Sequence, residues 1–238
     1  MSRFVADQVK VVNLALRHLA QTSGVVDMDT DTSEAAEAAR AWYPMALDEV
    51  LRDFRWPFAT SFATLALVAG PTPPATIEYQ YSYRYPIDCI KLLRILPGGT
   101  SGSMSAPAFP ASGVQLPLSR FDTLASRVPY RVTQDTAGLL ILTDFAPQAA
   151  TTNTPALPIV EYTAQVDDAT RYPADFASCL SLLLATYMAP TLTGGDRFKL
   201  GARAMQLYEM RRAAAQANAM NEQQPDPTSD AELIQARS

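Results

Sequence analysis

The sequence contains few of the residues that build most metal sites and disulfide frameworks. Its 238 residues include one histidine, His18, and two cysteines, Cys89 and Cys179. A zinc site needs several His or Cys ligands at suitable spacing, and the sequence offers none. We interpret His18 as a surface or packing residue and the two cysteines as buried free thiols rather than a disulfide. We therefore expect no metal and no cofactor.

Positive charge is also scarce, and no apolar run is long. The formal net charge is −5, from 19 Lys and Arg against 24 Asp and Glu. This argues against tight binding to DNA phosphates, which needs clustered Lys and Arg. The most apolar stretch, ASCLSLLLATYMAP (177–190), is shorter than the roughly 20 residues of a membrane-spanning helix. It predicts a buried helix and no membrane association.

Short catalytic motifs are missing from the sequence. It contains no GxSxG, P-loop, HExxH or GxGxxG pattern. Carboxylate pairs such as Asp167–Asp168 and Asp48–Glu49 could serve a glycosidase, but solvated loop and helix faces explain them more simply. We expect a protein that is not an enzyme.

Apolar residues recur at helical spacing near both ends of the chain. The N-terminal segment has Val5, Val9, Val12, Leu16 and Leu19. In a second helix, Asp31 and Glu34 have capping-box spacing, Pro44 predicts a kink or a late start, and Pro57 predicts an end close to Arg55. The apolar stripe of this helix comprises Tyr43, Leu47, Val50, Leu51 and Phe54.

Two more helices are predicted after residue 171. Pro173 suits the first turn of one of them, and Pro190 followed by Gly194–Gly195 should end it. Its apolar stripe comprises Phe176, Cys179, Leu180, Leu183, Leu184 and Tyr187. Asp196 should cap a last, basic helix whose inward positions are Phe198, Ala202, Met205 and either Tyr208 or Glu209.

Between the helices the period of the pattern changes from 3.6 to 2, which predicts about six short strands. One of them, in EYQYSYRYPIDC (78–89), has tyrosine at every second position: Tyr79, Tyr81, Tyr83 and Tyr85. Alternate residues of a strand share a face, so this row is either a stacking platform for bases or sugars or a packed sheet face. We favour the packed face, because the basic rim that a nucleic-acid platform needs is missing, and we expect Glu78, Gln80, Ser82 and Arg84 to be solvated.

These patterns predict an α+β fold: a mostly antiparallel bundle of four helices, two N-terminal and two C-terminal, with a central inserted antiparallel β domain, a small sandwich or barrel. Residues 1–58 and 171–220 would form the two halves of the bundle, and residues 59–170 the insert. A long loop at 97–129 contains the uncharged, Gly-, Ser- and Pro-rich segment 98–113. Residues 221–238 form an acidic tail that we expect to be unfolded in the free chain.

Three pieces of the sequence, taken in order, carry a resemblance to a known family. They are W-x-F-A (Trp56, Phe58), Y-x-Y-P-x-D-C (Tyr83, Tyr85, Pro86, Asp88, Cys89) and Y-P-x-x-F (Tyr172, Pro173, Phe176). Together with VNLALRHLA (12–20) and LDEVLRDFRWPFA (47–59), they resemble the tail tubular protein A family of short-tailed bacteriophages, the head-to-tail adaptors. The resemblance covers most of residues 5–215. We expect these motif residues to determine the fold rather than to contact a partner.

The resemblance implies a structural virion protein in the neck of the tail, assembled in the host cytoplasm. Such adaptors form a dodecameric ring between the portal and the tail nozzle, a tail tubular protein B-like partner, and extend the channel through which DNA is ejected. A tail fibre protein is a further partner that this position allows. The bundle and the C-terminal tail would face the portal, through Arg203, Arg211, Arg212, Glu222, Asp226, Asp230, Glu232, Leu233 and Ile234.

Other functions stay open at this point. The chain could be a different phage connector or neck protein, although most of those are smaller. A wall-degrading tail enzyme or a sugar-binding module that uses the tyrosine row are the remaining alternatives.

Since an acidic subunit repels phosphates, a channel lined by such acids would let DNA pass without specific binding.

Overall fold

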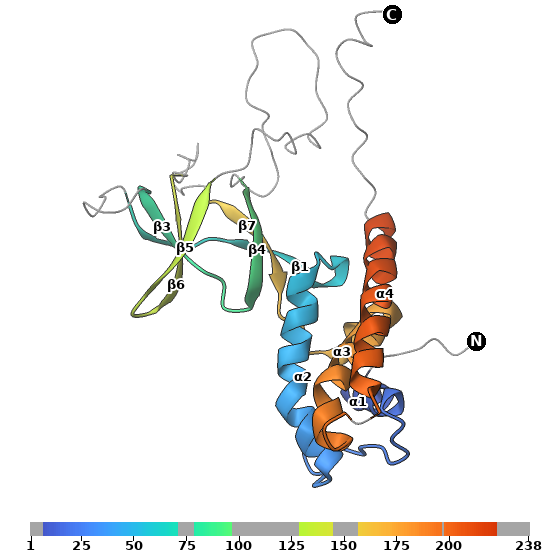
Figure 1. The fold of residues 1–238 in the computed structure, drawn as a ribbon. Helices are drawn as coiled ribbons and strands as arrows, with labels where there is room; N and C mark the ends of the chain where they lie inside the picture. Colours follow the sequence, from blue (N-terminus) through green and yellow to red (C-terminus); the bar gives the residue numbers. More distant parts are fainter. Residues whose placement is uncertain (1–6, 71–78, 97–128, 145–156, 197, 223–238) are drawn as a thin grey trace, which may run out of the picture. The chain divides into compact units, whose positions relative to one another are not determined.

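The predicted α+β class is confirmed by the computed structural model, which contains four helices and two antiparallel sheets among its described residues (Figure 1). The structure describes residues 7–70, 79–96, 129–144, 157–196 and 198–222. The predicted segment 98–113 and most of the acidic tail lie outside these ranges.

The described residues divide into two compact units. Those up to Thr60 and from Ala164 onward form a helical unit, and those between Ser61 and Thr163 form a β unit. The helical unit is therefore built from two pieces of chain that are far apart in the sequence.

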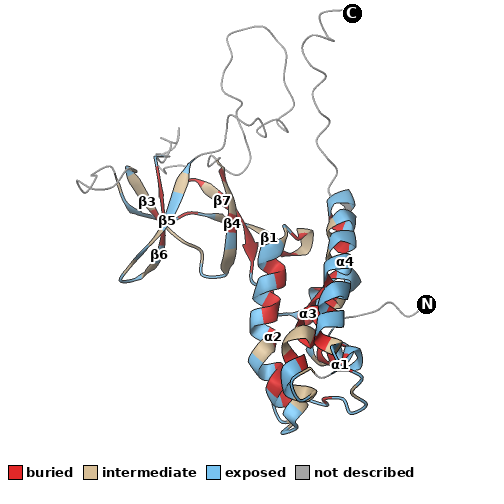
Figure 2. Cartoon of the chain, viewed as in Figure 1, coloured by how far each residue is buried: buried red, intermediate tan, exposed pale blue. Residues whose placement is uncertain are grey.

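Helix α3 (Ala174–Leu192) is the central element of the helical unit, and it packs against α1 (Gln8–His18), α2 (Glu34–Asp53) and α4 (Leu200–Glu222). Its apolar side chains from Phe176 to Met188 are almost all buried, which explains why it is the most apolar helix of the chain (Figure 2). Asn218 near the end of α4 donates to Asp175 at the start of α3, so these two helices run antiparallel.

Helix α3 is also longer than the 14-residue apolar stretch suggested. Its 19 residues make it long and apolar enough to cross a membrane by length and composition, and 61% of its apolar window is buried inside the protein. The helix ends at Leu192, between Pro190 and the Gly194–Gly195 pair with its positive φ angles, so the predicted end is confirmed. Pro173 precedes the helix at the N-cap position.

The start of α2 differs from the prediction. The N-cap is Ser33, whose hydroxyl accepts a hydrogen bond from the Ala36 N–H at 3.3 Å. The Asp31 carboxylate instead accepts from the N–H groups of Val26 and Ser33 within the preceding loop. Pro44 lies inside the helix, which starts before it at Glu34, so the late start was also wrong. The helix ends at Asp53, close to the predicted Arg55.

Helix α4 buries a different face from the one predicted. Phe198, Ala202 and Met205 are exposed, and Tyr208 is the one predicted position that is buried. The buried side is made mainly of small residues: Gly201, Ala204, Tyr208, Ala215 and Ala219. Small residues let two helix backbones come close together. Because the exposed side of α4 also contains alanines, the apolar pattern of the sequence did not indicate which side makes the contact. The cap was predicted correctly, since the Asp196 carboxylate accepts from the N–H groups of Gly201 and Ala202.

The β unit contains two sheets. The first has the order β1-β7-β4, with β1 (Thr60–Thr64), β7 (Ile159–Ala164) and β4 (Cys89–Leu96). The second has the order β2-β3-β6-β5, with β2 (Leu67–Ala69), β3 (Tyr81–Arg84), β6 (Gly138–Thr143) and β5 (Tyr130–Asp135). The described residues of this unit form seven short strands, close to the predicted number of about six. The Tyr130 hydroxyl on β5 donates to the Leu92 carbonyl on β4 at 3.4 Å, which connects the two sheets.

Candidate functional site

The first and third motif pieces converge in one aromatic cluster of the helical unit. The Phe176 ring lies 5.1 Å from Trp56, 4.8 Å from Phe58 and 5.0 Å from Tyr172, measured between ring centroids, with steeply inclined planes. Edge-to-face contacts of this kind stabilise a core beyond the area they bury. Phe176 and Trp56 are buried, so neither offers a surface to a partner.

Polar contacts fix the same cluster. The indole N–H of Trp56 donates to the Val50 carbonyl at 2.8 Å, and the Tyr172 hydroxyl donates to the Val166 carbonyl at 2.6 Å. Burial raises the pKa of Tyr172, because its ionised form would be poorly solvated there. The cluster connects the segment that follows α2 with the segment that leads into α3. These residues hold the fold together, as expected for the motif.

The second motif piece lies in the β unit around the turn between β3 and β4. The Tyr162 hydroxyl donates to both oxygens of the Asp88 carboxylate, at 3.0 and 3.1 Å. Asp88 follows Tyr85–Pro86, a position typical of a turn, and the bond from the Cys89 N–H to the Pro86 carbonyl closes this turn. Between Pro86 and Asp88, Ile87 is fully exposed, at 103% of its reference area.

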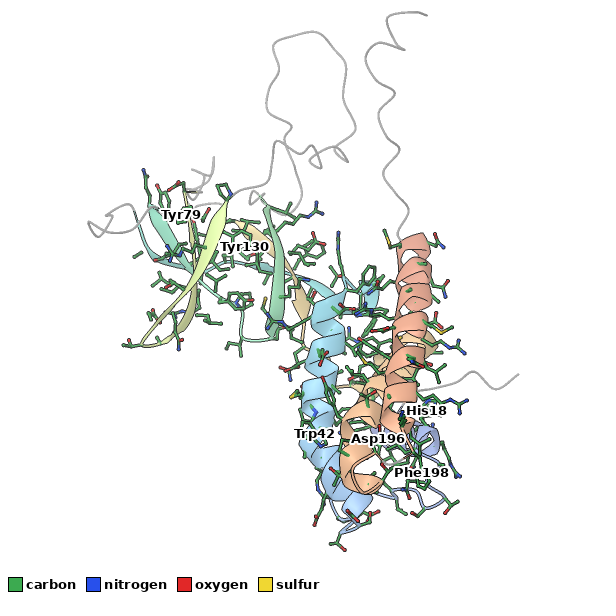
Figure 3. The ribbon with its side chains drawn as sticks, in the orientation of Figure 1. His18, Trp42, Tyr79, Tyr130, Asp196 and Phe198 are labelled. Atoms are coloured by element: carbon green, nitrogen blue, oxygen red, sulfur yellow. The ribbon has the colours of Figure 1, made fainter. Side chains whose placement is uncertain are left out.

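The tyrosine row is a packing feature and is shorter than predicted. Tyr83 is completely buried, while Tyr79, Tyr81 and Tyr85 are half-buried (Figure 3 labels Tyr79). Burial raises the pKa of Tyr83 to about 12. A fully buried ring cannot stack on a base or a sugar, so the platform interpretation loses its central member.

The face opposite the tyrosines is not simply solvated. Arg84 is half-buried and forms a two-bond ion pair with the Asp135 carboxylate, at 3.0 and 3.2 Å. Ser82 is half-buried as well, whereas Gln80 is exposed.

The proposed portal-binding arginines occupy α4 in two different environments. Arg203 and Arg211 are exposed. Arg212 is half-buried, lies 3.5 Å from the Asp53 carboxylate and 5.7 Å above the Tyr208 ring, and so contributes to the contact between α4 and the end of α2. Glu222 is the last residue of α4, and Asp226, Asp230, Glu232, Leu233 and Ile234 lie outside the described residues.

The outward side of α4 is more apolar than the sequence pattern predicted. Met210 is 71% exposed and Leu207 is 37% exposed, and Ala213, Ala214 and Ala217 on the same side are exposed too. Met210, Ala213, Ala214 and Ala217 lie away from the buried side defined by Ala204, Tyr208 and Ala215, and Leu207 lies at the boundary between the two sides. The high content of alanine and methionine was the available signal, but the sequence did not show which side faced the core.

The outward side of α2 combines acids with apolar residues. Glu34, Glu37 and Asp48 are exposed on it, and Ala41 and the 48% exposed Met45 lie between them. Beside this side, Trp42, which is labelled in Figure 3, stacks on Tyr187 of α3, with 5.5 Å between ring centroids and 22° between planes. The Tyr187 hydroxyl in turn donates to the Glu49 carboxylate.

The residues that could support chemistry do not assemble into a reactive group in the part of the chain that the structure describes. His18 is exposed at the end of α1, and no group of three or more His, Cys, Asp and Glu side chains in the described ranges could hold a metal ion. Cys179 is buried and Cys89 is half-buried, and both are free thiols. The candidate functional surfaces are therefore the outward sides of α2 and α4.

The comparisons with known proteins leave the family undetermined: no family model matches the chain, and no curated protein is significantly similar to it.

Proposed function

We propose that this protein is a structural virion protein, a head-to-tail adaptor of a short-tailed phage. In this role it forms a dodecameric ring between the portal and the tail nozzle and extends the DNA ejection channel. It works in the neck of the virion after assembly in the host cytoplasm, and the role includes no reaction and no cofactor.

The observation that supports the proposal most is the position of the motif residues. Trp56, Phe58, Tyr172 and Phe176 come from both sides of a stretch of about 110 residues, yet their rings touch. They lie where the chain leaves the helical unit and where it returns. The resemblance implies this plan, an antiparallel helical bundle interrupted by one β insert, and we propose it for the whole chain.

The surfaces fit a subunit that binds proteins rather than a small molecule. Two sides of the helical unit are exposed and partly apolar, and exposed apolar patches mark interaction sites. The net charge of −5 suits a channel through which DNA slides without being held. The partners in this proposal are further copies of the chain, the portal, the nozzle protein and a tail fibre protein.

The experiment is to mix the purified chain with its portal and to follow mass and shape by light scattering and electron microscopy. A closed ring on the portal supports the adaptor role, and a chain that ignores the portal contradicts it.

A truncated variant tests the portal-binding residues of the C-terminal tail. Removing residues 221–238 should leave the fold intact, as judged by circular dichroism, and abolish portal attachment. Normal docking of this truncated chain would contradict the role of the tail.

A further inference from the structure

We propose that the outward side of α4 binds the outward side of α2 on a second copy of this chain. The inference deepens the proposed function and rests on it for the closed ring. It assigns two specific surfaces of the helical unit to the contact between neighbouring subunits.

The two surfaces differ in composition from a helix side that meets only water. The α4 surface presents Leu207, Met210 and Ala214, and the α2 surface presents Ala41 and Met45. A helix side that meets only water usually carries charged and polar residues. Methionine and alanine at exposed positions are suited to a flat helix–helix contact, since methionine adapts its shape to its neighbour.

The two surfaces carry opposite net charge. The α4 surface has two exposed bases, Arg203 and Arg211, against one exposed acid at its edge, Glu209. The α2 surface has three exposed acids, Glu34, Glu37 and Asp48, against one exposed base, Arg52. Arg40, beside these acids, donates to the carbonyls of Met28 and Asp31 and so is held by the loop before α2. Copies that meet through two α2 surfaces or two α4 surfaces would repel each other. Contact between an α4 surface and an α2 surface brings opposite charges together, which fixes the partner and its orientation.

Both surfaces belong to helices that pack on the same α3, so the scaffold holds them in fixed positions relative to each other. Because the two surfaces differ, each copy has one surface left over after it binds a neighbour. A contact of this head-to-tail type closes into a ring when the rotation between copies allows it, and otherwise extends into a filament.

The test uses charge reversal on the full chain, without the portal. The first variant combines Arg203→Glu with Arg211→Glu, and the second combines Glu37→Lys with Asp48→Lys. Each should weaken self-association about tenfold or more at low ionic strength, measured by sedimentation velocity, because like charges then face each other. Arg131→Glu, an exposed position on β5, is the matched control and should associate as the original chain does.

Mixing the two variants gives the decisive result. Every contact in an alternating assembly then pairs opposite charges, so association should recover when the variants are combined in equal amounts. Circular dichroism confirms that each variant is folded. A mixture that stays dissociated overturns the inference, and so does an original chain that remains monomeric in concentrated solution at low ionic strength.

The outcomes separate this inference from the adaptor role. Recovery in the mixture without ring formation on the portal would keep the α2–α4 contact and contradict the adaptor function. A ring on the portal that both variants form as readily as the original chain would keep the adaptor function and contradict the contact.

Discussion

Gly201 on α4 lies against Ala189 on α3 so closely that a Cβ atom on Gly201 would be 2.7 Å from the Cβ of Ala189. The Gly201 N–H also donates to the Asp196 carboxylate at 2.9 Å, which caps α4 at the same place. The missing side chain thus allows the two helices to approach each other and the cap to form.

We predict that Gly201→Ala destabilises the protein. Alanine gains about 1 kcal/mol of helix propensity over glycine, but forcing a methyl group into a packed helix contact costs about 1–3 kcal/mol. We expect a net loss of about 1 kcal/mol in the free energy of unfolding, measured by urea denaturation.

The compensating variant is the control for this prediction. In an Ala189→Gly background the space for the new methyl group is available, so Gly201→Ala should then stabilise the protein. A Gly201→Ala single variant that is more stable than the original chain would show that the helices separate easily here.

Cys179 should be unreactive in the folded protein. It is completely buried on α3, and burial raises the pKa of its thiol to about 11, so the reactive thiolate is rare at neutral pH. In a Cys89→Ser variant, a thiol reagent at pH 8 should modify the remaining cysteine only after denaturant is added. Rapid modification of the folded variant, followed by mass spectrometry, would show that α3 is exposed by local opening.

The ion pair between Arg94 on β4 and Glu161 on β7 should be costly to break from one side. Glu161 is completely buried, and the Arg94 guanidinium donates to its carboxylate. Arg94→Leu leaves a buried carboxylate without this partner, which costs about 3–5 kcal/mol of stability. Urea denaturation should show this loss.

Replacing both members of the pair provides the comparison. The Arg94→Leu, Glu161→Leu double variant should recover most of the stability, because no buried charge remains. A double variant that is as unstable as Arg94→Leu alone would show that the cost comes from lost packing around the strands.

The sequence predicted those parts of the fold in which an apolar pattern decides the structure. In α2 and α3, large apolar residues at helical spacing identify both the helix and its buried side, as Leu47 and Leu180 illustrate. The strands were found from the change of the apolar period from 3.6 to 2. Trp56 and Phe176 are buried, as large aromatic residues usually are.

The parts that could not be predicted depend on contacts between distant segments. The buried side of α4 is set by Gly201, Ala204 and Ala215, which carry no apolar signal above that of the exposed alanines. The ion pair of Arg84 with Asp135 joins strands that are 51 residues apart in sequence. The outward sides of α2 and α4 became visible as candidate surfaces once the buried sides were known.

The stability of the β unit should depend on pH through Asp135. The Arg84 guanidinium beside Asp135 holds the pKa of its carboxyl below the ordinary 3.8, and the Ala137 N–H, which donates to the same carboxylate at 2.8 Å, adds to this effect. The folded state therefore favours the ionised form. This contribution to stability is present above pH 3.8 and is lost as the pH falls through the lower pKa of the folded state.

We predict that Asp135→Asn lowers the free energy of unfolding at pH 7 and that its difference from the original chain shrinks as the pH falls below 3.8. Urea denaturation at several pH values measures this difference. The decisive comparison is made in an Arg84→Met background, where the guanidinium is gone and Asp135→Asn should have a much smaller, nearly pH-independent effect. An equal pH dependence with and without Arg84 would assign the lowered pKa to the Ala137 N–H and the turn rather than to the ion pair.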